Sequence, residues 1–327
     1  MLSRRLAVMS LAAVLAGGVC LSAARPALAA DKVKVGVFPV GAALPYFVAL
    51  KRGYFAAEGI EPETVTLGTP ALIVQSLVTG AVDATSNLVT LEGANINARR
   101  PGTLKYFALL GQNRDDIFEQ FVVRADSPVK TLADLKGTRL FTSPGPANIG
   151  LSKAILAKVG LKDGVDYQMQ EQPLAVQTGA LKSGSFDGGY TLEPVASIMV
   201  KSGIARRVEG GVISTYLLEN PKAHAYAAGA AFSDAFMKAK PDVAARFAKA
   251  WFRAMDDVAR DPSVRAYLVT DMNVAQDVVE ELPLPHFERV KDLTPEQIAN
   301  FQKFIDIGVA LKVVASAVDV KTMLAPY

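Results

Sequence analysis

Cysteine occurs only once in this 327-residue sequence, as Cys20. Cys20 lies in an N-terminal segment where Arg4 and Arg5 precede an apolar run and which closes on Ala27-Leu28-Ala29. This pattern is typical of a secretory signal peptide over residues 1–29, and we expect cleavage after Ala29. The chain that remains has no cysteine, which excludes disulfides, thiolate nucleophiles and thiolate metal sites.

The leader leaves its export route open. Ser3-Arg4-Arg5-Leu6 resembles a twin-arginine signal, but Ala7 stands where that signal prefers a bulky apolar residue. The ordinary secretory route is therefore equally compatible with the sequence. Val19 precedes Cys20 where a lipoprotein signal needs a small residue, so we expect no lipid anchor.

Neither basic nor acidic side chains are in large excess. The sequence has 35 basic and 32 acidic side chains, and the leader contains three of the arginines, so the mature chain has a net charge of about zero. Nucleic acids and anionic membranes are bound by clustered basic residues, so neither is an expected partner. No apolar run after the leader is long enough to span a bilayer. We expect the partner to be a small molecule or another protein.

Strand and helix patterns alternate along the first part of the mature chain. Residues 32–37 change from alternating charged and aliphatic side chains to a purely apolar run, as a strand entering a buried sheet does. Apolar residues then recur at helical spacing over 47–55, and the same unit repeats up to a strand predicted at 104–110. Such alternation predicts an α/β fold.

A second α/β region begins with the strand predicted at 121–124. After a strand predicted at 226–228, the pattern is helical over 230–238, 243–260, 274–280 and 295–311. We expect these helices to pack on the first region. The prediction is two lobes with central mixed sheets flanked by helices: residues 30–119 and 225–327 form the first lobe, and residues 120–224 form the second. The chain would then cross between lobes near 120 and 224, at an expected hinge.

Four segments resemble a known family. Residues 45–55, 77–83 and 129–137 are similar to the nitrate/sulfonate/taurine group of ABC transporter substrate-binding proteins. Leu192-Glu193-Pro194 resembles an aromatic-Glu-Pro segment of that group, with Leu192 in place of its usual tryptophan. The resemblance extends from about residue 33 to residue 260.

This resemblance implies a type II periplasmic-binding fold with a ligand cleft between the lobes that closes on the ligand. It also implies location in the periplasm and delivery of the ligand to an ABC permease and its ATPase. Members of the group bind nitrate, sulfonates, taurine, pyrimidine vitamin precursors or aromatic acids, so the resemblance does not fix the ligand. We expect the protein to act as a monomer.

Candidate ligand-binding residues lie in loops that follow predicted strands, because ligands of open α/β sheets bind beyond the carboxyl ends of strands and near helix N-termini. The candidates are Phe38, Tyr46, Thr69, Ser86 and Asn87 in the first lobe, and Ser143, Asn148, Tyr190, Thr191 and Glu193 in the second. Alternatives stay open for several of them. Thr69 is equally suited to capping a helix, and Phe38 and Tyr46 to packing under one. Ser143 and Asn148 also suit a turn and helix cap, and Glu193 is better suited to a structural hydrogen bond than to an anion.

Groups that catalysis uses are scarce. The only histidines are His224, near the expected hinge, and His286, in a proline-rich stretch, and no nucleophile or metalloprotease motif occurs. Residues 145–152 have the glycine spacing of a P-loop, but Leu151 occupies the lysine position. We therefore predict a binding protein with no catalytic residues, cofactor or metal site.

The leading hypothesis for the ligand is a small organic anion, either a sulfonate or a carboxylate. The alternative is an aromatic or pyrimidine-type ligand that stacks on Tyr46 or Tyr190 and hydrogen-bonds to Asn87. An enzyme of the pyrimidine-synthesis type on the same fold ranks below both.

Overall fold

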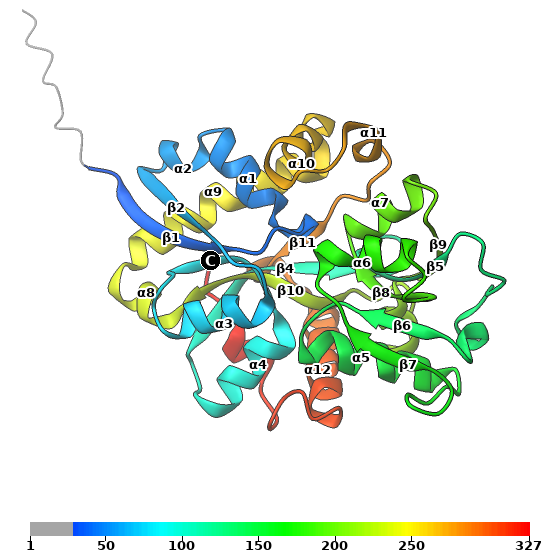
Figure 1. Ribbon diagram of the computed structural model, residues 1–327. Helices are drawn as coiled ribbons and strands as arrows, with labels where there is room; N and C mark the ends of the chain where they lie inside the picture. The colour runs from blue at the N-terminus through cyan, green and yellow to red at the C-terminus, as the bar shows by residue number, and fades with distance from the viewer. Residues whose placement is uncertain (1–28) are drawn as a thin grey trace, which may run out of the picture.

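The computed structural model describes residues 29–327, which form two lobes, each built on one mixed β-sheet (Figure 1). The strand order is β11-β4-β10-β3-β1-β2 in the first lobe and β7-β6-β8-β5-β9 in the second. The strands of the first sheet are β1 (Asp31–Val37), β2 (Ile60–Thr66), β3 (Ala84–Val89), β4 (Leu104–Gln112), β10 (Ala225–Ser233) and β11 (His286–Arg289). Those of the second sheet are β5 (Glu119–Arg124), β6 (Arg139–Thr142), β7 (Gln168–Glu171), β8 (Gly188–Leu192) and β9 (Ala205–Gly210).

Helices cover both sheets. Those of the first lobe are α1 (Leu44–Lys51), α2 (Tyr54–Ala57), α3 (Pro70–Val78), α4 (Thr90–Arg99), α8 (Asp234–Ala239), α9 (Pro241–Arg260), α10 (Arg265–Met272), α11 (Gln276–Val279) and α12 (Pro295–Ala310). Those of the second lobe are α5 (Pro146–Lys158), α6 (Leu174–Lys182) and α7 (Val195–Lys201). No helix within residues 29–327 combines the length and apolar character needed to cross a membrane.

The chain passes between the lobes twice. It leaves the first sheet after Gln112, enters the second sheet at Glu119, and returns to the first sheet at Ala225. β10 lies between β3 and β4 in the middle of the first sheet and is antiparallel to both. The segments 113–118 and 211–224 are thus the two connections on which the lobes can move relative to each other.

Aromatic packing dominates the core of the first lobe. Trp251 on α9 is fully buried, with the ring centroids of Phe107 and Tyr46 at 5.5 and 6.2 Å from its own. Phe55 stacks on Phe247 at 4.5 Å. The amphipathic helix α9 thus holds α1 and α2 against the sheet, because their apolar faces are removed from water together.

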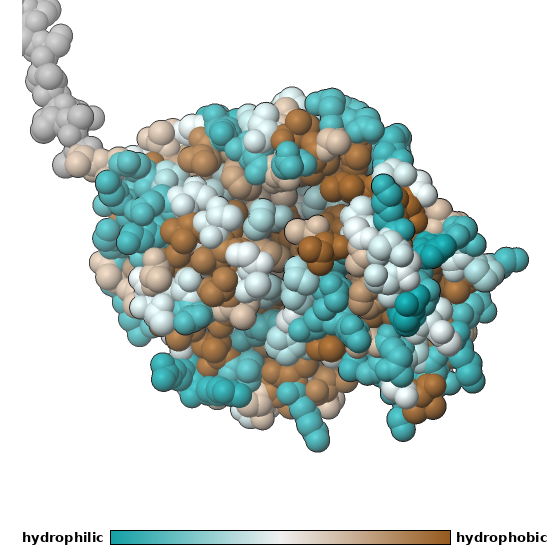
Figure 2. Space-filling model, in the orientation of Figure 1, coloured by the Kyte–Doolittle hydropathy of each residue, from teal (hydrophilic) through white to brown (hydrophobic). Residues whose placement is uncertain are grey.

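A second apolar cluster joins the two lobes. It contains Phe38 and Leu110 from the first lobe and Leu151, Phe121 and Tyr190 from the second, all of them buried. Continuous burial across the boundary means that the lobes are closed on each other. Figure 2 shows hydrophilic residues gathered toward the outer ends of the molecule on this face, with apolar patches nearer its middle.

Two predicted elements need correction. The helix predicted at 230–238 is wrong in its first part, because β10 continues to Ser233 and only α8 follows. Alanine-rich residues such as Ala230 and Ala231 favour helix, but pairing with β3 and β4 overrides that preference. Ser86 and Asn87 were expected to follow a strand, whereas β3 runs on to Val89 and contains both.

Two strands were not predicted. The C-terminal region was expected to hold only helices, but β11 pairs antiparallel with β4 at the edge of the first sheet. Prolines 283 and 285 precede it closely, and its four residues are half-buried, so no strand pattern was visible. β9 is an edge strand of the second sheet. Its sequence, Ala205–Gly210, is largely polar and also shows no strand pattern. The helix predicted at 274–280 is reduced to the single turn α11.

Candidate ligand-binding site

A largely apolar cavity lies between the two sheets. The first lobe contributes residues from the loop after β1, from the start of α3, and from β3, β4 and β10; the second contributes residues from the segment before β5, from α5 and α6, and from β8. The lining residues are Phe38, Val40, Ala42, Pro70, Asn87, Val89, Leu110, Gln112, Ala227, Ala228, Phe118, Pro144, Ala147, Asn148, Leu151, Leu174, Tyr190 and Leu192. Only about 40 Å³ is open to the centre of a water-sized sphere, so the lobes are nearly closed over it.

Strand periodicity explains which side chains reach the cavity. Side chains two apart on a strand point to the same face, and the pairs Asn87 and Val89, Leu110 and Gln112, and Tyr190 and Leu192 all line the cavity. The residues between them point to the opposite face. Four uncharged polar side chains, the amides of Asn87, Gln112 and Asn148 and the phenol of Tyr190, are the hydrogen-bonding groups of the lining.

Four of the ten candidate residues from the sequence line this cavity: Phe38, Asn87, Asn148 and Tyr190. Asn87 accepts a hydrogen bond from the Ser86 hydroxyl at 2.7 Å, which orients its amide. Asn148, in the first turn of α5, donates to the carbonyl oxygen of Pro144 at 2.7 Å. Burial raises the pKa of Tyr190 well above its ordinary value, so this phenol is protonated at neutral pH.

Three further candidates from the first lobe are buried or capping groups outside the lining. Tyr46 packs in the aromatic core and hydrogen-bonds with Thr64 at 2.5 Å. Thr69 caps α3 by accepting the Leu72 N–H at 3.3 Å, so the capping alternative describes its observed contact. Ser86 is buried and outside the lining, and its hydroxyl donates to the lining residue Asn87.

The other three candidates belong to the interior of the second lobe. Ser143 lies within 3.4 Å of the Tyr190 carbonyl oxygen, and Thr191 donates to Gln177 at 2.6 Å. Glu193 is fully buried and accepts hydrogen bonds from the Gln120 side chain at 2.6 Å and the Ser197 N–H at 3.2 Å. These contacts are structural hydrogen bonds, the role considered for Glu193 beside ligand binding.

Gln112 lines the cavity and was not among the candidates. It is the last residue of β4, two positions beyond the predicted end of that strand at Leu110. The missed signal is the alternation itself: extending the strand by one period places Gln112 on the same face as Leu110. Its side chain is almost completely buried, at 2% exposure.

Carboxylate side chains accept hydrogen bonds from backbone N–H groups at the start of α5, close to the candidate Asn148. The Gly145 N–H donates to Glu171 at 2.9 Å, and the Ala147 N–H lies 3.4 Å from an oxygen of Glu92. Glu92 comes from α4 in the first lobe, so this contact crosses between the lobes. Burial raises its pKa from 4.5 to about 7, and its second oxygen has no hydrogen-bond partner within residues 29–327.

A closed cavity between two α/β lobes that are joined by two chain crossings is the architecture of the type II periplasmic-binding fold, as the sequence predicted. Residues 42–264 match the family model described as NMT1/THI5 like. The chain therefore belongs to the NMT1/THI5-like family. No curated protein matches the sequence.

Solved structures confirm the fold. The alkanesulfonate-binding protein SsuA from Xanthomonas axonopodis pv. citri, bound to MOPS, is 18% identical with a TM-score of 0.73, over 91% of this chain and 99% of that chain. The nitrate-binding protein NrtA from Synechocystis PCC 6803 is 14% identical with a TM-score of 0.67, over 89% and 84%. The desulfurization enzyme DSZB is 17% identical with a TM-score of 0.63, over 90% and 96%.

Proposed function

We propose that this chain is a periplasmic solute-binding protein that captures a small molecule between its lobes and delivers it, as a monomer, to an ABC permease and its ATPase. The observation that carries the proposal is a cavity enclosed by residues from both lobes, next to two chain connections that can bend. A ligand that contacts both lobes stabilises the closed form, and only its differential affinity for that form can drive closure. The secretory leader supports export.

For the ligand we favour a neutral aromatic or pyrimidine-type molecule. None of the side chains that line the cavity is charged. A buried anion without a cation or several donors is costly, and the two α5 amides best placed for it are engaged by Glu92 and Glu171. The amides of Asn87, Gln112 and Asn148 offer both donors and acceptors, which suits a ring with polar atoms on its edge.

A small sulfonate or carboxylate is the second candidate ligand. The fold is shared with proteins named for alkanesulfonate and nitrate binding, and Asn148 presents a polar side chain at a helix N-terminus in the cavity. If Glu92 withdrew as the lobes adjusted, the freed N–H groups would become available to such an anion. The two candidates therefore make opposite predictions in a binding screen.

Binding is favoured over catalysis by the same lining. The fold also carries an enzyme, the desulfurization enzyme DSZB. Apart from the phenol of Tyr190, which its raised pKa keeps protonated, the lining has no serine, threonine, cysteine, histidine, lysine, arginine or carboxylate to act as nucleophile or general acid–base. Both histidines, His224 and His286, lie outside it.

The test is a thermal-shift screen of the mature chain, starting at Ala30, against pyrimidines, neutral aromatics, aromatic carboxylates, aliphatic sulfonates and nitrate. A ligand at 100 times its Kd stabilises the folded protein by about 2.7 kcal/mol, which raises Tm by a few degrees. We expect pyrimidines or neutral aromatics to raise Tm. A rise with sulfonates alone would select the anion, and no rise with any compound would contradict both ligand classes.

Lobe closure is tested separately, by small-angle X-ray scattering with the compound that raises Tm most. The radius of gyration should fall when that compound is added. An unchanged radius with saturating ligand would contradict the closure step and leave the cavity as a static site.

A further inference from the structure

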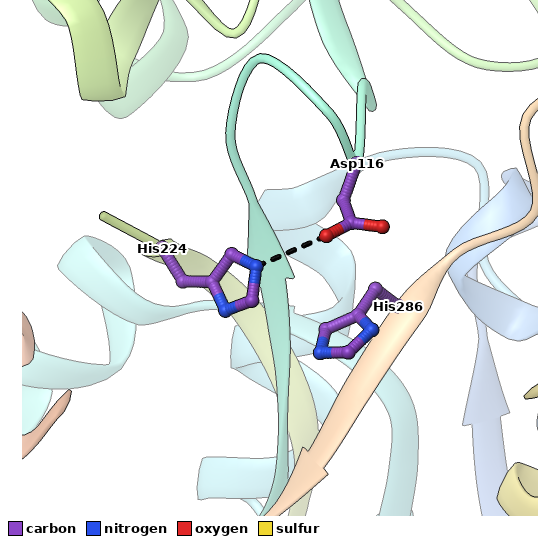
Figure 3. A group of neighbouring side chains, drawn as sticks. All are labelled: Asp116, His224 and His286. Carbon is purple, nitrogen blue, oxygen red and sulfur yellow. Dashed lines mark hydrogen bonds and ion pairs between the residues drawn. The ribbon is translucent and has the colours of Figure 1, made fainter. Parts of the chain in front are cut away.

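The only two histidines of the sequence meet at the connections between the lobes (Figure 3). Asp116 belongs to the segment that joins β4 to β5, His224 immediately precedes β10, and His286 begins β11. One ligand atom from each of the three residues lies within 4.8 Å of the others. His224 Nε2 and Asp116 Oδ2 are 3.0 Å apart.

The residue beneath these side chains is a glycine. Gly111 on β4 lies under both imidazole rings, and a Cβ at that position would be 3.0 Å from the His224 ring and 3.2 Å from the His286 ring. The two ring centroids are 4.7 Å apart. The absence of a side chain at Gly111 thus allows the imidazoles to approach each other.

Glu288 contacts both imidazole rings. Its Oε1 is 2.6 Å from His224 Nδ1 and 3.3 Å from His286 Nε2. Its Oε2 accepts hydrogen bonds from the Tyr226 hydroxyl at 2.5 Å and the Gln297 amide at 2.7 Å. Histidines that bind metals commonly have their second ring nitrogen held by a carboxylate in this manner, which fixes the ring orientation.

We propose that Asp116, His224 and His286 form a site for a divalent transition-metal ion, with Zn²⁺ as the best-suited ion. Two imidazoles and one carboxylate are a donor set that Zn²⁺ takes readily, with a fourth position left for water. Zinc–ligand bonds of 2.0–2.1 Å place tetrahedral donors roughly 3.3 Å apart. Asp116 Oδ2 and His224 Nε2, at 3.0 Å, are close to that spacing, and a nitrogen of His286 lies within 4.8 Å of both residues.

Charge and access fit a dication. Asp116 and Glu288 together supply two negative charges, which offset the charge of the ion. His286 is the most open member, with 41% of its side chain exposed, so an ion can enter from solvent. The three ligands come from separate parts of the chain with no motif spacing between them, which is why the sequence analysis predicted no metal site.

A bound ion would tie both connections between the lobes to β11 of the first lobe. Asp116 is on the outgoing connection and His224 on the returning one. These are the segments that bend when the lobes move, so the ion adds a constraint that a hydrogen-bonded cluster alone does not. The site is distinct from the cavity, and none of its residues lines it.

Isothermal titration of ZnCl₂ into the EDTA-stripped mature chain tests the proposal, and the protein must carry no histidine tag. We expect saturable binding of one ion per chain. H286Q and D116N should each weaken it by more than about 100-fold, and E288Q, which changes a positioning residue, by about 10- to 100-fold. The matched control D126N removes an exposed carboxylate that pairs with Arg124 far from the site, and should bind as the wild type does.

Cobalt supplies a readout that a purely structural role would not produce. Co²⁺ at a four-coordinate site with nitrogen ligands absorbs in the visible range, and H286Q should lose this absorption while its circular dichroism stays native. The proposal is overturned if the wild type shows no saturable Zn²⁺ binding, or if the H224Q/H286Q double variant binds Zn²⁺ equally well.

Discussion

The cavity and the cluster of Asp116, His224, His286 and Glu288, which we call the hinge cluster, both lie near the lobe-connecting ends of β4 and β10 yet differ in chemistry. β4 places Leu110 and Gln112 in the cavity and leads on to Asp116, while β10 follows His224 and places Ala227 and Ala228 in the cavity. The cavity lining has only uncharged side chains, whereas the hinge cluster pairs two imidazoles with two carboxylates. Charged side chains thus lie where they form ion pairs. They are absent from the cavity lining, where a bound ligand would remove their hydration.

The largest expected effect is on the hinge cluster. His224 is 17% exposed and bridges Asp116 and Glu288, so H224Q leaves two carboxylates without their cation. In EDTA at pH 7 we expect the free energy of unfolding to fall by roughly 2–4 kcal/mol, as measured by urea denaturation. The control K222Q removes an exposed ion pair with Asp115 and should cost about 0–1 kcal/mol. Equal losses for the two variants would contradict a special role for the hinge cluster.

The second effect concerns pH and the contact between the lobes. Burial raises the pKa of Glu92 from 4.5 to about 7 in the closed form, where its carboxyl contacts the Ala147 N–H of the second lobe. Its titratable neighbour Tyr106, also deeply buried, stays protonated over this range. An acid with a raised pKa stabilises the closed form fully below pH 4.5, and this stabilisation, at most roughly 3 kcal/mol, is lost as pH rises through about 7.

Small-angle scattering at pH 5 and pH 8 measures this effect. We expect the wild-type radius of gyration to increase at pH 8, and E92Q to keep one radius at both values. E119Q is the matched control, because burial raises the pKa of Glu119 to about 8 although its side chain makes no hydrogen bond with the first-lobe helix α4; within the described residues its carboxyl accepts the Ile213 N–H of the 211–224 connection. E119Q should therefore retain the wild-type response, and a loss of that response would show that opening does not depend on Glu92.

A smaller effect separates the cavity from the core. Y190F removes a hydroxyl from the cavity, and Y46F removes one from the first-lobe core. For the compound found in the thermal-shift screen, Y190F should raise Kd by about 2- to 10-fold, the value of one hydrogen bond, as measured by calorimetry. Y46F should leave Kd unchanged. A larger effect of Y46F on Kd would place the ligand elsewhere.

The smallest effect tests a position just outside the cavity. Thr69 caps α3, while its neighbour Pro70 lines the cavity. T69A should lower the free energy of unfolding by about 0.5–1 kcal/mol, because the Leu72 N–H loses its acceptor, and should not alter Kd. A several-fold rise in Kd would restore Thr69 as a ligand contact.

Much of the fold was predictable because local patterns agreed with it. The capping role considered for Thr69 indicated the start of α3, and the helical patterns over 243–260 and 295–311 predicted α9 and α12. Where tertiary pairing decided the outcome, the sequence was misleading. Ala230 and Ala231 resemble helix residues but lie in the middle of a sheet, and β11 is a strand only because β4 offers a free edge.

The cavity was predictable in part. Loops after strands pointed to Phe38, Asn87, Asn148 and Tyr190, but the face on which a side chain lies depends on register. Ser86 and Thr191 are each one residue from a lining position and therefore point away from it. The hinge cluster was not predictable, since Asp116 and His224 are 108 residues apart and meet only through the two crossings.

The central position of β10 sets an order for biosynthesis. Until residues 225–233 leave the ribosome, β4 has no neighbour in the first sheet, because β10 alone connects it to β3. The strands of the second sheet all lie between residues 119 and 210, so that sheet can assemble while the first is still in two parts. The order of the strands along the chain therefore allows the inserted lobe to form before the first lobe is complete.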